Sequence, residues 1–334
     1  MKKKLIATIL TLVIAAGGAL LYILQQNSYD MVEKAVVIDT PQGVLSGTLT
    51  LPKGEGGKLG LVLFIHGDGP INASHNDGYK PLWEKLASLG YASLSLDKRG
   101  IGGSEGSWLK QSIDDRVEEA RQALAWAKTQ PMIDDSRIGV WGASQAGWVI
   151  PKLAGKERLA FSILVSPAIN WLTQGEYNTR SQMAKEGYSN TEIESQVAYE
   201  KEIKELLLNG ATYADYAAIS HKGEPMTEER WEFVQKNVRS DANADLANFQ
   251  TPVLLLLGEK DIHVDVKETE AVYRAIIPSA LLSVEVFPDT EHSMLSVQTA
   301  DSELRAWWLS LFQPRNITVK GYMDAIEQFL KEGL

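Results

Sequence analysis

The stretch VWGASQAG, residues 140–147, joins the end of an apolar run to a segment that can begin a helix. Small residues surround Ser144 at this junction, which is typical of a strand that turns sharply into a helix. Apolar runs that resemble buried strands recur along the chain, and helical patterns lie between them. Strands that alternate with helices predict an α/β fold with a mostly parallel sheet flanked by helices.

Turn residues and glycines bound the runs that we predict as strands. These lie at 33–40, 43–52, 59–67, 91–97, 137–142, 161–167, 252–258 and 281–287. Ile113, Val117, Ala120, Leu124 and Ala127 recur at steps of four and three, which predicts an amphipathic helix over 113–130. Further helices are expected at 79–90, from Gln145 onward, at 266–276 and at 301–312.

Residues 169–249 differ in texture from the rest of the chain. They contain no strong strand run and are rich in Glu, Lys, Ala, Tyr and Gln. Because strands are predicted on both sides, we interpret this segment as a helical cap inserted into one domain over 29–334. Its aromatic residues are expected to pack the insertion onto the core: Trp171, Tyr177, Tyr188, Trp231 and Phe233.

The N-terminus has the pattern of a membrane segment. Lys2, Lys3 and Lys4 precede residues 5–24, which carry no charge and are mostly apolar. About twenty such residues at ~1.5 Å rise span the ~30 Å hydrocarbon core of a bilayer. We therefore expect residues 1–28 to form a signal anchor in the cell membrane, with the rest of the chain outside the cytoplasm. A cleaved signal peptide, with small residues at 16–18 and a secreted product, is the alternative.

Composition excludes several classes of protein. The formal net charge of −10 argues against nucleic-acid binding, and the absence of cysteine excludes disulfides and a cysteine nucleophile. No H-E-x-x-H zinc motif and no G-x-x-x-x-G-K-[ST] phosphate loop is present. We therefore expect neither a metal nor a cofactor, and oligomeric state cannot be inferred.

Polar residues follow several predicted strands, at the sheet edge where ligands bind in open α/β sheets. A serine needs an adjacent base, itself oriented by a carboxylate, to become a nucleophile. Ser144, Asp261 and His292 all follow predicted strands and could form such a set. The other histidines fit the base role less well: His66, His75, His221 and His263. Asp265 is the alternative acid, and Asp97 and Arg99 are expected to brace neighbouring loops.

Five motifs occur in one order along the chain: HGDGP at 66–70, DKRGIGGSEG at 97–106, GASQAGWVIP at 142–151, GEKDIHVD at 258–265 and EHSM at 291–294. Together they resemble the α/β-hydrolase superfamily, in its dienelactone-hydrolase-like and serine esterase group. The resemblance covers about 60–295 but leaves the cap unmatched. One departure is Ala146, which stands where the G-x-S-x-G turn has its second glycine. The extra methyl should be tolerated beside Gly147.

The resemblance implies roles for these residues. Ser144 would be the nucleophile, Asp261 the acid and His292 the base, while the backbone N–H groups of Gln145 and of Asp68 or Gly69 would hold the oxyanion. It implies a serine hydrolase that cleaves a small-molecule carboxylic ester through an acyl-enzyme. A peptidase or acyltransferase on the same triad is the alternative. A third hypothesis is a catalytically silent fold that serves as a binding protein.

Overall fold

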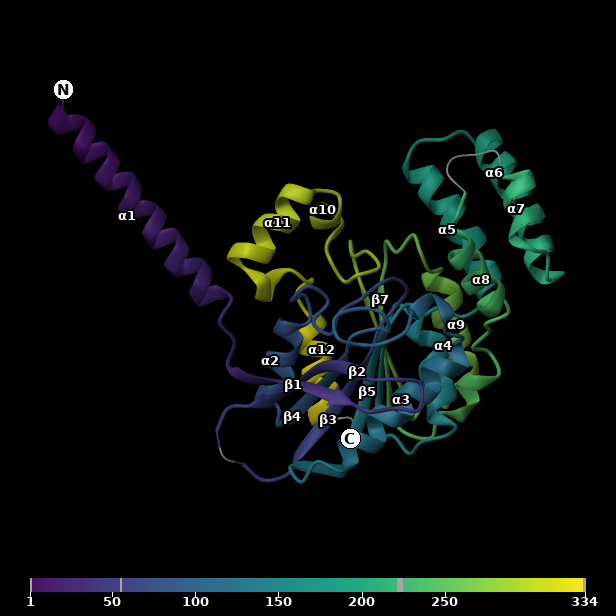
Figure 1. Cartoon of the computed structure of the whole chain (residues 1–334), viewed down its shortest axis with the longest axis horizontal. Helices are drawn as coiled ribbons and strands as arrows, with labels where there is room; N and C mark the ends of the chain where they lie inside the picture. Colours follow the sequence, from purple (N-terminus) through teal and green to yellow (C-terminus); the bar gives the residue numbers. More distant parts are fainter. Residues whose placement is uncertain (1, 55, 221–224, 333–334) are drawn as a thin grey trace.

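A computed structural model describes residues 2–54, 56–220 and 225–332 of the chain. Its centre is one sheet of eight strands with helices on both faces (Figure 1). The strands are β1 (Met31–Ile38), β2 (Leu45–Pro52), β3 (Leu59–Ile65), β4 (Tyr91–Leu96), β5 (Ile133–Ala143), β6 (Ser162–Val165), β7 (Val253–Gly258) and β8 (Leu282–Phe287). Every predicted strand is present, with bounds that differ by a few residues.

The strands lie in the order β1-β2-β4-β3-β5-β6-β7-β8. β1 and β2 form an antiparallel hairpin, and β2 pairs antiparallel with β4. All pairs from β4 across to β8 are parallel. The α/β prediction, with a mostly parallel sheet, is therefore confirmed. The carboxyl ends of β3 to β8 meet at one edge, where side chains from distant parts of the sequence can converge.

Two apolar layers cover the faces of the sheet. On one face lie α3 (Ile113–Lys128), α4 (Ala146–Ala154) and α9 (Val266–Ile276), and on the other lie α2 (Lys80–Ser88) and α12 (Tyr322–Glu332). Central strands are buried on both sides, which explains why they form continuous apolar runs. The sequence analysis assigned no element to α12, whose Ile326, Phe329 and Leu330 are buried against the sheet.

In the part of the segment between β6 and β7 that the structure describes, the α-helices are α5 (Trp171–Lys185), α6 (Asn190–Leu208), α7 (Tyr213–Ile219) and α8 (Glu228–Asn237). We call them the inserted helices. They have a small apolar cluster of their own in which Trp231 and Phe233 are fully buried. Trp171 stacks on Trp148 of α4, as expected, but Tyr188 is exposed and does not pack on the core. His221 lies outside the described residues.

The N-terminal helix α1 (Lys2–Gln26) projects away from the sheet (Figure 1). It is long and apolar enough to cross a membrane, by length and composition, and none of its apolar stretch is buried. These properties fit both a signal anchor and a signal peptide. Near its end, α1 packs against α11 (Glu303–Phe312), which follows the short helix α10 (Val297–Ala300).

The crossing of β5 and α4 explains the sequence VWGASQAG. A side-chain carbon on Gly147 would lie 2.6 Å from the Ala168 carbonyl oxygen and 2.8 Å from its nitrogen. One on Gly142 would lie 2.6 Å from the methyl of Ala146. Gly142 therefore makes room for the extra methyl of Ala146 where β5 meets α4, and Gly147 lets α4 approach the backbone of Ala168 in the segment after β6. The sequence analysis placed the relief for the Ala146 methyl at Gly147, but the glycine that faces this methyl is Gly142.

Gly147→Ala should destabilise the fold by about 1–3 kcal/mol, because the new methyl meets backbone that cannot move aside. Gly175→Ala is the matched control, since Gly175 is a helical glycine in α5 with nothing within 4 Å of the added carbon. It should be neutral or stabilise by up to about 1 kcal/mol. Thermal unfolding midpoints of the two variants measure the contrast. Equal shifts for both variants would contradict a close approach of α4 to the Ala168 backbone at Gly147.

Candidate active site

Ser144 occupies a strained position between β5 and α4. Its φ angle is +54°, in the left-handed region that residues other than glycine rarely adopt. The backbone is held there from both sides, because its N–H donates to the Val165 carbonyl at 2.9 Å and its carbonyl accepts from Gly147 and Ala168. Strain of this kind persists only where surrounding contacts impose it. The turn lifts the Ser144 side chain beyond the end of the sheet.

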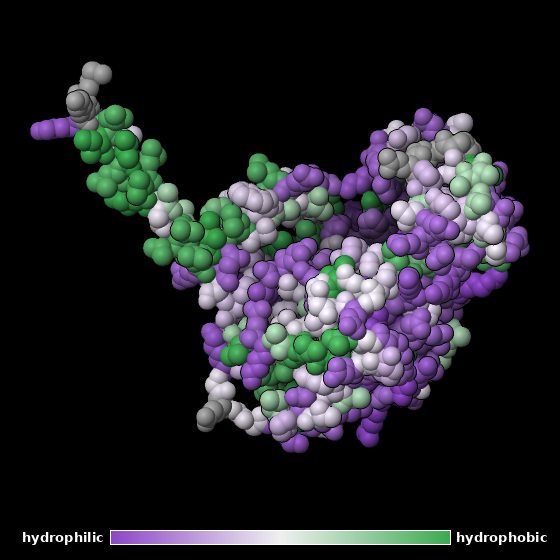
Figure 2. Space-filling view, in the orientation of Figure 1, coloured by the Kyte–Doolittle hydropathy of each residue, from purple (hydrophilic) through white to green (hydrophobic). Residues whose placement is uncertain are grey.

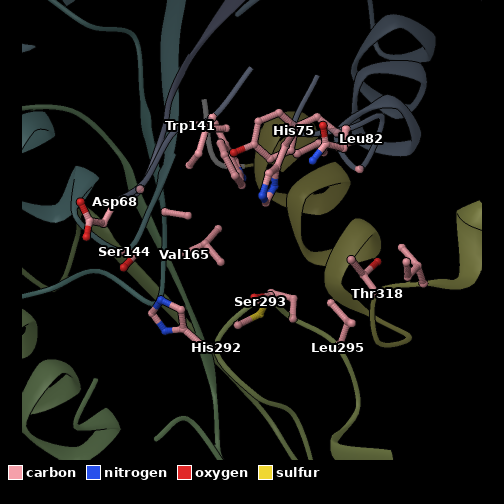
Figure 3. A pocket seen from close by; sticks show the side chains of 18 of the residues that line it. Asp68, His75, Leu82, Trp141, Ser144, Val165, His292, Ser293, Leu295 and Thr318 are labelled. Carbon is pink, nitrogen blue, oxygen red and sulfur yellow. The ribbon is translucent and has the colours of Figure 1, made fainter. Parts of the chain in front are cut away.

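Asp261 and His292 come together from the turns after β7 and β8. The His292 Nδ1–H donates to Asp261 Oδ2 at 2.7 Å. The other carboxylate oxygen accepts the backbone N–H groups of His263 at 2.7 Å and Val264 at 3.0 Å. The Asp261 carboxylate is buried, and these three hydrogen bonds fix its orientation. With Nδ1 engaged, the remaining ring nitrogen of His292 faces the Ser144 hydroxyl (Figure 3).

The surroundings of His292 alter its basicity. Burial lowers the pKa of the imidazole, but the hydrogen bond and the charge of Asp261, with the charge of Glu291, outweigh it. The pKa therefore lies above the ordinary value of 6.5. His263 lies with its ring 5.1 Å from that of His292, and burial together with the charge of His292 lowers its pKa. The pKa values of His292 and His263 are thus shifted in opposite directions. Of the two rings, only that of His292 is hydrogen-bonded to a carboxylate.

Ser144 and His292 open into a cavity of about 760 Å³. It extends from these residues past Val165 and Trp141 toward Leu82, Leu295 and Thr318 (Figure 3). This volume is in the range of sites for small molecules. Most side chains that line the end remote from Ser144 are apolar or uncharged.

The 66–70 loop passes directly beside Ser144. A side-chain carbon on Gly67 would lie 3.3 Å from the Ser144 Cβ. Next to it, the Asp68 carboxylate accepts from the Gln145 side chain at 3.3 Å, so the two expected oxyanion residues are neighbours. Within the described residues, neither backbone N–H is used in another hydrogen bond. The N–H of Gly69, by contrast, is directed to the Asp68 carboxylate.

Two buried basic side chains, Lys98 and Arg116, hold this loop by hydrogen bonds, and the sequence analysis missed both. Lys98 Nζ donates to the Gly67 carbonyl at 3.0 Å, and burial followed by the nearby charge of Arg116 lowers its pKa to about 6. Arg116 donates to the His66 carbonyl and, at 2.5 Å, to the Gln145 side chain. A Lys in a charged loop and an Arg within a helix are ordinarily solvated. Their sequence context therefore carried no signal.

A third basic side chain reaches the loop from the inserted helices. Arg230 of α8 pairs with Asp68 through two bonds of 3.2 and 2.6 Å and lies over the ring of Phe233. Burial raises the pKa of the Asp68 carboxyl, but the hydrogen bond and charge of Arg230 outweigh it, so the pKa is lowered. The negative charge beside the expected oxyanion position is therefore compensated.

Helix α5 contacts the opposite side of the site. The Tyr177 hydroxyl donates to the Asp261 carbonyl at 2.9 Å. Asn178 donates to the Ile262 carbonyl at 3.1 Å and lies 2.8 Å from His263 Nδ1. The inserted helices therefore contact both the turn that carries Asp261 and the loop that carries Asp68.

The other candidates have structural contacts. His66 lies 2.7 Å from the Leu96 carbonyl, and burial lowers its pKa to about 3. Asp265 caps α9 by accepting from Lys267 and Glu268. Asp97 accepts from Ala73, and Arg99 contacts the β1–β2 turn and Glu119, as expected for bracing residues. His75 lines the cavity. In the described ranges no group of three His, Asp or Glu is placed to hold a metal ion.

Comparison with known proteins identifies the family. A family model described as serine aminopeptidase, S33, matches residues 57–297, well over half of the chain. Over 251 residues the chain is 25% identical to dipeptidyl-peptidase 5 of Porphyromonas gingivalis, which covers 73% of this chain and 32% of that protein. Over 110 residues it is 36% identical to the quorum-quenching protein AidA of Acinetobacter baumannii, or 32% of this chain and 35% of that protein. The chain thus matches about a third of the length of each relative.

Solved structures share the fold at low identity. The esterase Pf2001 of Pyrococcus furiosus superposes with a TM-score of 0.56 and 18% identity, covering 90% of this chain and 91% of that chain. Est1E of Butyrivibrio proteoclasticus with ferulic acid bound gives 0.53 and 18%, covering 83% and 99%. The match to the family model, over the segment that carries the parallel strands β3 to β8 and the residues at their ends, shows that the chain belongs to the serine aminopeptidase S33 family and is a serine hydrolase of the α/β-hydrolase superfamily.

Proposed function

We propose that this protein is a carboxylic ester hydrolase that works through a Ser144–His292–Asp261 triad. The observation that carries the proposal is the buried bond from His292 to Asp261, on a ring that faces the hydroxyl of a strained serine (Figure 3). A carboxylate in this position fixes the tautomer of the base and stabilises the imidazolium that forms.

In the proposed reaction, Ser144 Oγ attacks the ester carbonyl while its proton moves to His292. The tetrahedral intermediate collapses, and His292 gives the proton to the departing alcohol. Water then loses a proton to His292 and attacks the acyl-serine. Return of the proton to Ser144 Oγ frees the carboxylic acid and restores the enzyme. All steps use residues of this chain.

The oxyanion would be held by the backbone N–H groups of Gln145 and Asp68. Because a trans peptide sets its C=O and N–H in opposite directions, Lys98 bound to the Gly67 carbonyl turns the Asp68 N–H away from itself. Arg230 keeps the Asp68 carboxylate paired, so that its charge does not oppose the oxyanion. We therefore assign Lys98 and Arg230 as positioning residues for this loop.

A peptidase on the same triad is the second candidate, because the family and the curated relatives carry peptidase names. A peptide substrate with a free amino terminus needs a carboxylate to receive the amine. Among the described residues that line the cavity, the carboxylates are Asp68 and Asp77, and each is paired with a cation. This pairing favours an ester, and p-nitroanilide analogues measured beside p-nitrophenyl esters compare the two.

We further propose that α1 is retained as a membrane anchor, with the hydrolase domain outside the cytoplasm. Contacts at the end of the helix support this. Asn27 donates to the Leu311 carbonyl at 2.8 Å, and Arg315 donates to the carbonyls of Gln26 at 2.6 Å and Ser28 at 2.9 Å. Hydrogen bonds therefore hold the end of α1 against the hydrolase domain.

Ser144→Ala should lower the turnover of p-nitrophenyl acetate by at least about 10³-fold, because it removes the attacking oxygen. The same substitution should abolish labelling by a fluorophosphonate. Ser293→Ala is the control, since Ser293 lies in the same cavity but follows the base, and its variant should still be labelled. Labelling that survives in the Ser144 variant would assign the nucleophile to another residue.

The acidic limb of the pH profile of kcat/KM should lie above pH 6.5. The proposed base must be neutral, and its raised pKa means that activity is lost as pH falls through that higher value. Glu291→Gln removes one charge that raises the pKa of His292, while the amide oxygen can still accept from Ser293 and Leu295. The limb should move to lower pH with the plateau nearly unchanged. An acidic limb at the same pH in the variant and the wild type would show that the charge of Glu291 does not raise the pKa of His292.

Lys98→Met should lower kcat about tenfold and change KM little, since loss of the Gly67 contact frees the peptide that carries the proposed oxyanion donor. Active-site titration with a fluorophosphonate gives the concentration of folded enzyme, so that kcat refers to competent sites. A fall that disappears after this correction would mean that Lys98 only stabilises the fold.

A further inference from the structure

Helix α11 presents an apolar face to solvent. Leu304, Trp307, Trp308 and Leu311 follow the i, i+3, i+4, i+7 spacing of one helix face. Leu304 is 75% exposed, Trp307 57% and Trp308 44%, and α11 has no fully buried residue. We call this face the α11 surface. Large exposed apolar groups on adjacent turns indicate a contact surface.

The α11 surface adjoins the end of the proposed anchor. α1 packs against α11, and the Asn27–Leu311 bond ties the two together. Figure 1 shows α11 beside the inner end of α1, and Figure 2 shows the apolar surface of α1 entering the body of the molecule there. An anchor that leaves the bilayer at this point brings α11 to the level of the headgroups. Tryptophan is the residue enriched at that level.

The cavity reaches the same place. Its lining includes Asn27 and Tyr29 after α1, Ser310 on α11, and Ile317 and Thr318 beyond it. Figure 2 shows the surface hollowed between α11 and the inserted helices. One continuous space therefore connects Ser144 with the junction of α1 and α11. Apolar residues such as Leu82, Leu295 and Met323 line the intervening part.

We propose that the α11 surface lies in the outer headgroup region of the membrane and that the enzyme takes lipophilic esters from the bilayer through the cavity opening beside it. This rests on the proposed ester hydrolysis and on retention of α1. It adds a docking surface and a substrate class: an ester with a long acyl or alkyl chain that partitions into membranes. Trp307 and Trp308 would contact lipid, and the apolar lining would receive the chain.

Depth is tested first, with the full-length chain in phosphatidylcholine vesicles and in vesicles that contain brominated lipid. Bromine quenches tryptophan only at close range. Because α1 contains no tryptophan, anchoring alone gives no quenching from that helix. We expect quenching in the wild type and loss of most of it in the double variant Trp307→Ser, Trp308→Ser. Unquenched wild type, in vesicles shown by flotation and intact mass to carry the whole chain, would overturn the proposal.

Substrate entry is tested with two esters. The double variant should hydrolyse p-nitrophenyl palmitate in vesicles about tenfold more slowly, while turnover of soluble p-nitrophenyl acetate stays unchanged. The control is Val37→Ser with Val286→Ser, which removes exposed apolar side chains from the sheet instead of α11. The control should reduce neither rate. Equal loss on both esters in the Trp variant would overturn entry from the membrane.

Failure of the proposed function gives a different result. A wild type that hydrolyses neither ester contradicts ester hydrolysis, while bromine quenching still reports whether α11 meets lipid. Two further measurements identify which molecule supplies the long acyl or alkyl chain and which partner covers the α11 surface. Release of fatty acid from the vesicle phospholipid itself would make the substrate a membrane lipid. Dimers in detergent that the Trp variant dissociates, with unquenched wild type, would assign the α11 surface to self-association and overturn the proposal.

Discussion

The close crossing of β5 and α4 is the constraint on which the site depends. The chain must leave the sheet and begin a helix within two residues, and the first of them, Ser144, accepts a left-handed backbone to do so. Gly142 allows α4 to approach β5, and Gly147 allows α4 to approach the backbone of Ala168 after β6, because neither glycine has a side chain. The order β5, β6, β7, β8 then sets the rest of the geometry. Parallel neighbours end at one edge, so residues after β7 and β8 arrive beside the serine.

The inserted helices contact the candidate active site from two sides. α5 contacts the turn of Asp261, while Arg230 of α8 contacts the loop of Asp68. One helical unit therefore touches both the side that orients the proposed base and the side that would hold the oxyanion. A shift of that unit would alter both at once.

The sequence predicted what depends on local pattern. Buried strands form continuous apolar runs, and residues that follow parallel strands converge, so Ser144, Asp261 and His292 could be chosen before their distances were known. Arg230 could not, because it lies 162 positions from Asp68 in a polar helix that resembles a solvated one. Lys98 and Arg116 were missed because burial depends on tertiary packing. The spacing of Ile326, Phe329 and Leu330 did indicate a helix, and α12 could have been found from it.

Only residues 27–30 separate the end of α1 at Gln26 from the start of β1 at Met31. Four extended residues reach about 14 Å, much less than the width of the domain. In a chain anchored through α1, the hydrolase cannot lift away to sample the surrounding solution. For a substrate dissolved in the membrane, the relevant concentration is then the number of substrate molecules per unit of membrane area. The rate of hydrolysis rises with that surface concentration. A water-soluble ester, by contrast, still reaches the same cavity from the surrounding solution.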